Sequence, residues 1–97
     1  MSVVAFSKLK PEFLEQAKPV AAKLIEATRK EEGNIKYDWY EDVKEPGSGV
    51  AIEKFKSMEA FQVHASSDHI KEAGSHFKEW AAVPTVVRVL KPENVWA

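Results

Sequence analysis

Residues 53–69 read EKFKSMEAFQVHASSDH, and this stretch decides the fold. Glu53 and Phe55 alternate with two lysines, which is typical of the end of a half-buried strand. Ser57 then precedes a short amphipathic segment, and Ser67 precedes a second one. Serine is favoured at helix starts because its hydroxyl accepts a hydrogen bond from a free backbone N–H group. The stretch therefore predicts a strand followed by two separately capped helices.

The rest of the chain repeats this kind of pattern on both sides. Hydrophobic periodicity predicts strands at 2–9, 34–43, 50–56 and 85–90, and helices at 12–32, 58–65 and 68–81. Pro19 falls inside the first helix, where we expect a kink or a restart. The order βαββαβ is that of the ferredoxin-like split unit. The sequence thus predicts one α+β domain over residues 1–97, with an extended tail at 91–97.

One face of the predicted sheet has no cover within the chain. The predicted helices pack on the face that carries Glu53 and Phe55, whereas Val50 and Ile52 point to the other face. The last strand is apolar on both faces apart from Arg88. Because an apolar sheet face must be buried against something, the pattern predicts a homodimer.

Composition excludes several classes of function. The chain has 97 residues, 44% hydrophobic and 30% charged, and a net charge of -1, so no global field attracts nucleic acid or a membrane. It has no cysteine, which excludes disulfides and thiolate chemistry. There is no signal-peptide pattern, and no apolar run approaches the roughly 18 residues of a membrane span. Glycine-rich nucleotide-binding and GxSxG motifs are absent. We expect a cytoplasmic protein without a bound cofactor.

The histidines are the main candidates for chemistry. His64 lies late in the short helix and suits the role of a proton acceptor, because its pKa is near neutral. The alternative is a half-buried histidine that only closes the helix end. Glu53 faces the helices and needs a partner, for which His64 and Arg88 are candidates. His69 lies in the first turn of the second helix, where it is either catalytic or a capping contact.

A metal site is not expected from the spacing of these residues. His69 and His76 are seven positions apart, about 10 Å along a helix. His64 and His69 flank a helix break and could converge, but no third ligand follows at zinc spacing.

Three patches of sequence resemble one known family. They are the pattern Glu-x-aromatic-x-Ser-x-Glu-Ala-aromatic-x-x-His in 53–64 with its second histidine at His69, the patch 26–33 followed by Tyr37, and Lys-Leu-Lys-Pro at 8–11. Together they resemble the antibiotic biosynthesis monooxygenase family of dimeric α+β barrels. The resemblance implies oxidation of phenols or quinols by O₂ without a cofactor.

The resemblance also implies a cavity between sheet and helices for a small aromatic or quinone-like molecule. The catalytic candidates are His64, Glu53 and His69, and the candidate lining residues are aromatic: Tyr37, Trp39, Phe55, Phe61, Phe77 and Trp80. The haem-degrading branch differs, since it has Trp at the position of His64 and its haem-ligand histidine at the position of Gly74. The substrate stays open. The alternatives are an isomerase or other acid–base enzyme using His64 and His69, and a non-catalytic dimeric ligand-binding module.

Overall fold

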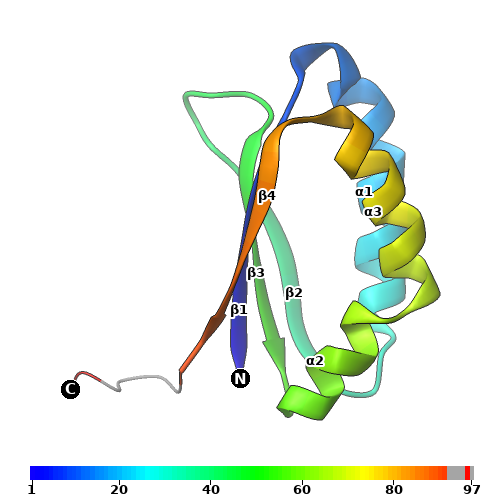
Figure 1. The fold of residues 1–97 in the computed structure, drawn as a ribbon, viewed down its shortest axis with the longest axis vertical. Helices are drawn as coiled ribbons and strands as arrows, with labels where there is room; N and C mark the ends of the chain where they lie inside the picture. Colours follow the sequence, from blue (N-terminus) through cyan, green and yellow to red (C-terminus); the bar gives the residue numbers. More distant parts are fainter. Residues whose placement is uncertain (92–95, 97) are drawn as a thin grey trace.

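The computed structural model describes residues 1–91 and 96. Its elements follow one another along the chain as shown in Figure 1: β1 (Ser2–Leu9), η1 (Pro11–Phe13), α1 (Leu14–Arg29), β2 (Asn34–Glu41), β3 (Ser48–Phe55), α2 (Met58–Ala65), α3 (Asp68–Trp80) and β4 (Ala81–Leu90). The two long helices, α1 and α3, lie on the same side of the sheet (Figure 1). None of the helices in the described part is long and apolar enough to cross a membrane.

The four strands form one antiparallel sheet in the order β2-β3-β1-β4. The β2–β3 pair is a hairpin, and β1 lies between β3 and β4, as the split βαββαβ topology requires. The predicted α+β, ferredoxin-like fold is therefore confirmed. The extended tail predicted for residues 91–97 lies almost entirely outside the described residues.

The core lies between this sheet and the helices. Phe55 and Val3 are completely buried on the helix side of the sheet, and Leu24 of α1 is 3% exposed. Ala51 and Glu53 are buried on the same side as Phe55, whereas Ile52 is 37% exposed. The predicted alternation of β3 is thus confirmed, and it places a carboxyl group among apolar side chains.

The first helix differs from its prediction at both ends. It begins at Leu14 after a 3-10 turn and ends at Arg29, so the predicted span 12–32 is too long. The helix continues through Pro19, so of the two expected outcomes, a kink or a restart, the restart is wrong. The early end matters for the site, because residues 30–33 form a non-helical turn instead of continuing the helix.

The last strand begins at Ala81, four residues before its predicted start at Thr85. Pro84 lies inside it, next to shifts in the register between β4 and β1. Proline is tolerated there because β4 is an edge strand that pairs only with β1. In β2, the register shifts between Asn34 and Lys36, and Ile35 is 58% exposed although strict alternation would place it on the buried face of Tyr37.

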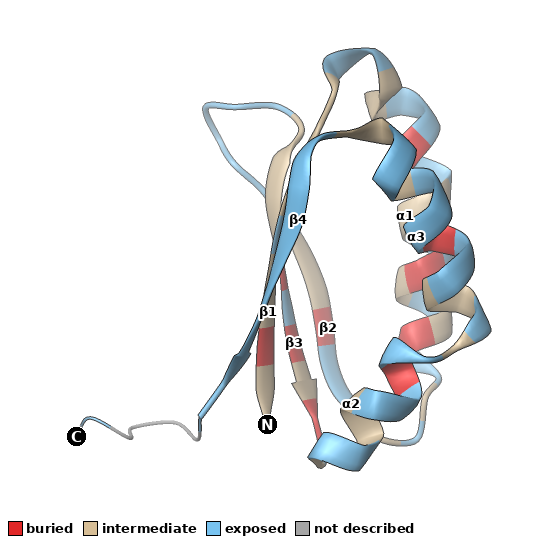
Figure 2. Ribbon diagram, viewed as in Figure 1, coloured by how far each residue is buried: buried red, intermediate tan, exposed pale blue. Residues whose placement is uncertain are grey.

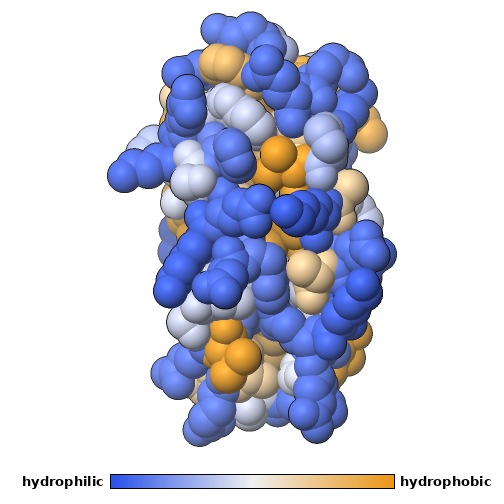
Figure 3. All heavy atoms as spheres, turned by 90° about the vertical axis from the view of Figure 1, so that its right-hand side faces the viewer, coloured by the Kyte–Doolittle hydropathy of each residue, from blue (hydrophilic) through white to orange (hydrophobic). Residues whose placement is uncertain are grey.

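The sheet face opposite the helices is open in the single chain. Phe6 pairs with Val50 on one side and Val86 on the other, and Phe6 is 49% exposed. Almost all of β4 is exposed (Figure 2). The helix side, which faces the viewer in Figure 3, is mostly hydrophilic with small hydrophobic patches. The open sheet face therefore carries exposed apolar side chains, Phe6, Ile52 and Val86 among them, that no other element of the described chain covers.

Candidate functional site

Two serine caps position the histidines. Ser57 begins α2 by accepting a hydrogen bond from the backbone N–H of Ala60 at 3.1 Å. Ser67 begins α3 by accepting from the N–H of Ile70 at 3.3 Å, and its own hydroxyl donates to the carbonyl of His64 at 2.7 Å. Because Ser67 joins the end of α2 to the start of α3, the helix break holds His64 and His69 in a defined arrangement.

A glycine brings the turn after α1 against α2. A Cβ atom added to Gly33 would lie 2.4 Å from the Cβ of Ala60, so only glycine fits at this approach. The backbone N–H of Lys56 donates to the carbonyl of Gly33 at 2.9 Å, which ties the same turn to the end of β3. Glu31 lies in this turn and is carried towards α2.

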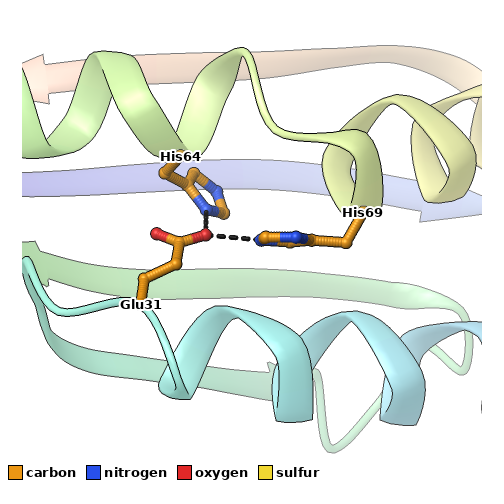
Figure 4. Close-up of side chains that lie close together, drawn as sticks. All are labelled: Glu31, His64 and His69. Carbon is orange, nitrogen blue, oxygen red and sulfur yellow. Dashed lines mark hydrogen bonds and ion pairs between the residues drawn. The ribbon is translucent and has the colours of Figure 1, made fainter.

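Glu31, His64 and His69 meet at one point, although they come from the turn after α1, from α2 and from α3 (Figure 4). Oε2 of Glu31 lies 2.9 Å from Nδ1 of His64 and 2.5 Å from Nε2 of His69. The other oxygen of Glu31, Oε1, is buried and has no hydrogen-bond partner in the described part of the chain. An ionised carboxylate only accepts hydrogen bonds, so in this geometry Nδ1 of His64 donates to Glu31, while Nε2 of the same ring points away from Glu31.

Glu53 lies on the other side of the His64 ring. Its Oε1 is 3.8 Å from Nε2 of His64, which is too long for a hydrogen bond. Burial, and next the charge of Glu31, raises the pKa of Glu53 to about 7. Burial, followed by the charge of Glu53, also raises the pKa of Tyr37, so its phenol stays protonated. The ring of His64 thus has an acidic group at each nitrogen, one hydrogen-bonded and one close.

Aromatic rings enclose His64, which is 3% exposed. Its ring centroid lies 5.1 Å from that of Phe55, 5.3 Å from that of Tyr37 and 6.4 Å from that of Phe61. Close packing by three aromatic rings holds the imidazole of His64 in one orientation. It also lowers the local dielectric constant, which strengthens the interaction with Glu31.

A cavity of about 730 Å³ lies beside this ring. Its wall includes Glu53, His64, Tyr37 and Trp39 at one side, and residues 81–85 of β4 at the other. Most of the remaining lining is apolar, with Leu24, Phe61, Ile70 and Phe77 among its members. A mainly apolar cavity with a few convergent polar groups is the usual form of a site for a small organic ligand.

Not all predicted site residues reach this cavity. His64, Glu53, Tyr37, Trp39, Phe61 and Phe77 line it, whereas Phe55, Trp80 and His69 are not among its lining residues. Phe55 is completely buried behind His64. Trp80 instead stacks on Phe13 and on His76, with centroid distances of 6.1 and 5.2 Å. His69 lies on the far side of Glu31, with its side chain 25% exposed.

Sequence reasoning missed Glu31, because the predicted helix extended past it to residue 32. The signal was present in the patch 26–33, whose match to the family pattern includes Glu31 and Gly33. The sequence of this turn does not show which other element the turn contacts. The role of Glu31 depends on its tertiary contact with α2, which the sequence does not reveal.

Comparison with known proteins agrees with this architecture. Residues 1–82 match the family described as antibiotic biosynthesis monooxygenase. The chain is 35% identical over 80 residues to "Putative monooxygenase YcnE" of Bacillus subtilis (strain 168), covering 82% of this chain and 84% of the relative.

Solved structures are similar over nearly the whole chain. One described as an antibiotic biosynthesis monooxygenase superposes with a TM-score of 0.90 at 26% identity, covering 94% of this chain and 96% of its own. A conserved protein from Methanosarcina mazei Go1 gives a TM-score of 0.89 at 30% identity, covering 95% and 91%. Rv0793 from Mycobacterium tuberculosis gives 0.88 at 27% identity, covering 99% and 97%. With residues 1–82 matched by the family pattern and the same fold throughout, the chain belongs to the antibiotic biosynthesis monooxygenase family.

Proposed function

We propose that the protein is a cofactor-independent monooxygenase that oxidises a small phenol or quinol with O₂. The observation that carries this proposal is the orientation of His64, whose Nδ1 is held by Glu31 while its other nitrogen lies towards Glu53, a residue of the cavity wall. Membership of the family supports the reaction class. The class of substrate, a small phenol or quinol, is also part of the proposal.

His64 acts as the general base in this proposal. With the proton on Nδ1 directed to Glu31, Nε2 accepts the hydroxyl proton of a bound phenol. The carboxylate of Glu31 stabilises the imidazolium that forms, as in other carboxylate–histidine pairs. His69 completes the arrangement by holding the same oxygen of Glu31. Glu53, for which His64 was a candidate partner, lies near Nε2 of this ring, on the side of the cavity.

The substrate supplies the electrons for the reaction. Deprotonation gives an electron-rich phenolate that reacts with O₂ at a ring carbon. One oxygen atom replaces the hydrogen on that carbon, the second leaves as water, and the phenol becomes a quinone. The apolar wall favours this step, because excluding water strengthens the electrostatic interactions in the site and limits side reactions.

The alternatives receive less support from the geometry. An isomerase that uses His64 and His69 as acid and base needs both rings at the substrate, but His69 does not line the cavity. A ligand-binding module without turnover is an outcome of the experiment below.

We also propose that two chains associate through their open sheet faces to form a barrel-like homodimer in the cytoplasm. Support comes from the exposed apolar side chains on that face, with Phe6 49%, Val86 45% and Ile52 37% exposed. Because β4 contributes both to that face and to the cavity wall through Val83 and Val87, the dimer also rigidifies the site.

The test is oxygen consumption with a panel of reduced quinones and phenols, with autoxidation subtracted. We expect enzyme-dependent uptake by the wild type, and a loss of at least about 100-fold in His64→Ala, since a general base contributes typically 10²–10⁴-fold. His76→Ala is the matched control, because His76 is exposed on α3 and does not line the cavity. It should keep wild-type uptake.

Two outcomes would overturn the proposal. Uptake that survives in a folded His64→Ala variant, checked by circular dichroism, would remove His64 as the base. Tight binding of the panel compounds without any oxygen consumption would identify a binding module. In either case the family and the fold stand.

A further inference from the structure

We propose that Glu31, His64 and His69 form a binding site for a borderline divalent transition-metal ion, with Zn²⁺ as the representative. The three side chains supply one carboxylate oxygen and two imidazole nitrogens, and their ligand atoms all lie within 4.8 Å of one another. Imidazole nitrogen with a carboxylate is a donor set that suits zinc and its neighbours rather than Mg²⁺ or Ca²⁺. The oxidation proposed above needs no metal, but this site shares Glu31 and His64 with it.

The distances are close to those of a coordination site. Ligand atoms around a tetrahedral zinc ion lie about 2.0–2.2 Å from the metal and so about 3.4 Å from each other. The present distances from Oε2 of Glu31, 2.9 Å to His64 and 2.5 Å to His69, are those of hydrogen bonds that the ion would replace. Each of these two pairs must separate by less than about 1 Å, and the two histidine nitrogens already lie within 4.8 Å of one another.

The surroundings favour binding of a cation. Oε1 of Glu31 is buried and unpartnered in the described part of the chain, so the carboxylate has unused acceptor capacity next to the histidines. Nε2 of His64, on the opposite side of the ring from the ion, has the carboxyl group of Glu53 at 3.8 Å. A carboxylate that accepts a hydrogen bond from the other nitrogen of a metal-binding histidine is the common outer-shell arrangement. Glu53 lies next to that nitrogen and would take this role if it moved within hydrogen-bond distance.

The cluster is preformed and reachable. Its three ligands come from three segments that Gly33 and Ser67 hold together, so binding costs little ordering. His69 has a side chain that is 25% exposed, whereas those of Glu31 and His64 are 11% and 4% exposed. An ion therefore enters past His69 from the surface, not through the cavity. Binding through Nδ1 leaves the proton of His64 on Nε2 and so blocks its use as a base.

The experiment is isothermal titration of Zn²⁺ into metal-depleted, untagged full-length protein, since a histidine tag would bind the ion itself. We expect one ion per chain, and at least a tenfold loss of affinity in both Glu31→Gln and His69→Ala. Glu31→Gln keeps the shape of the side chain, and His69 is partly exposed, so both variants should fold. His76→Ala, which removes an exposed histidine of the same helix, should bind as the wild type does.

Co²⁺ in place of Zn²⁺ gives an independent readout, because its visible absorption bands report coordination by nitrogen and oxygen. Absence of binding at millimolar Zn²⁺ would overturn the proposal, and so would binding that Glu31→Gln and His69→Ala leave unchanged or that His76→Ala abolishes. None of these measurements uses turnover, so a failure here is distinguishable from a failure of the oxidation proposal.

Discussion

At the residue scale, the buried carboxyl group of Glu53 makes stability depend on pH. Its pKa is raised from 4.5 to about 7 by burial and then by Glu31, and His64 and Tyr37 also face it. Between these two values the folded state binds more protons than the unfolded state, so the free energy of unfolding falls as pH rises, by up to about 3 kcal/mol.

Glu53→Gln should remove this decrease in the free energy of unfolding with rising pH. Relative to the wild type, the variant should gain about 1–3 kcal/mol of stability between pH 5 and pH 8, measured by urea unfolding in the presence of a chelator. Glu59→Gln, at an exposed position of the same helix as His64, is the control and should show no such trend. A stability difference that does not vary with pH would contradict the assignment of Glu53 as a buried, destabilising charge.

Individual residues were predictable where local pattern determines their position. Period-two alternation places Glu53 and Phe55 on the helix side, and the serine caps locate His64 and His69. The choice of partner was not predictable, because Nδ1 of His64 contacts Glu31, thirty-three residues away, while Glu53 stays at 3.8 Å. Sequence spacing carries no information on such a contact.

At the scale of elements, the approach of the α1–β2 turn to α2 depends on Gly33. Gly33→Ala would place a Cβ atom 2.4 Å from that of Ala60, so the turn and the helix must separate. We expect a loss of about 1–3 kcal/mol in the free energy of unfolding, as for other overpacked contacts, measured by chemical denaturation.

Gly74→Ala is the matched control: its added Cβ meets no atom within 4 Å, and alanine should stabilise α3 by up to about 1 kcal/mol. Equal effects of the two substitutions would show that the close approach is unimportant.

Element types were predictable, and some of their ends were not. Hydrophobic periodicity gives the three helices and four strands in the right order. It misses the start of β4 because Pro84 normally breaks a strand, and only the position of β4 at the sheet edge makes the proline acceptable. It also misses the end of α1, since residues 30–32 continue a helical composition while tertiary contacts of the turn end the helix.

At the scale of the whole molecule, the open sheet face is where we propose that a second chain binds. Val86 lies on this face opposite Phe6 and two residues from Arg88, and it is 45% exposed in the single chain. Val86→Lys would place a charge on each side of the proposed two-fold interface, where burial without a partner costs several kcal/mol. The dissociation constant should therefore rise at least about 100-fold, measured by sedimentation velocity across micromolar concentrations. Val43→Lys makes the same change in the β2–β3 loop, where the side chain is 97% exposed, and it should leave the wild-type dimer intact. A wild type that sediments as a monomer throughout, or a Val86→Lys variant that dimerises equally well, would contradict the proposed interface.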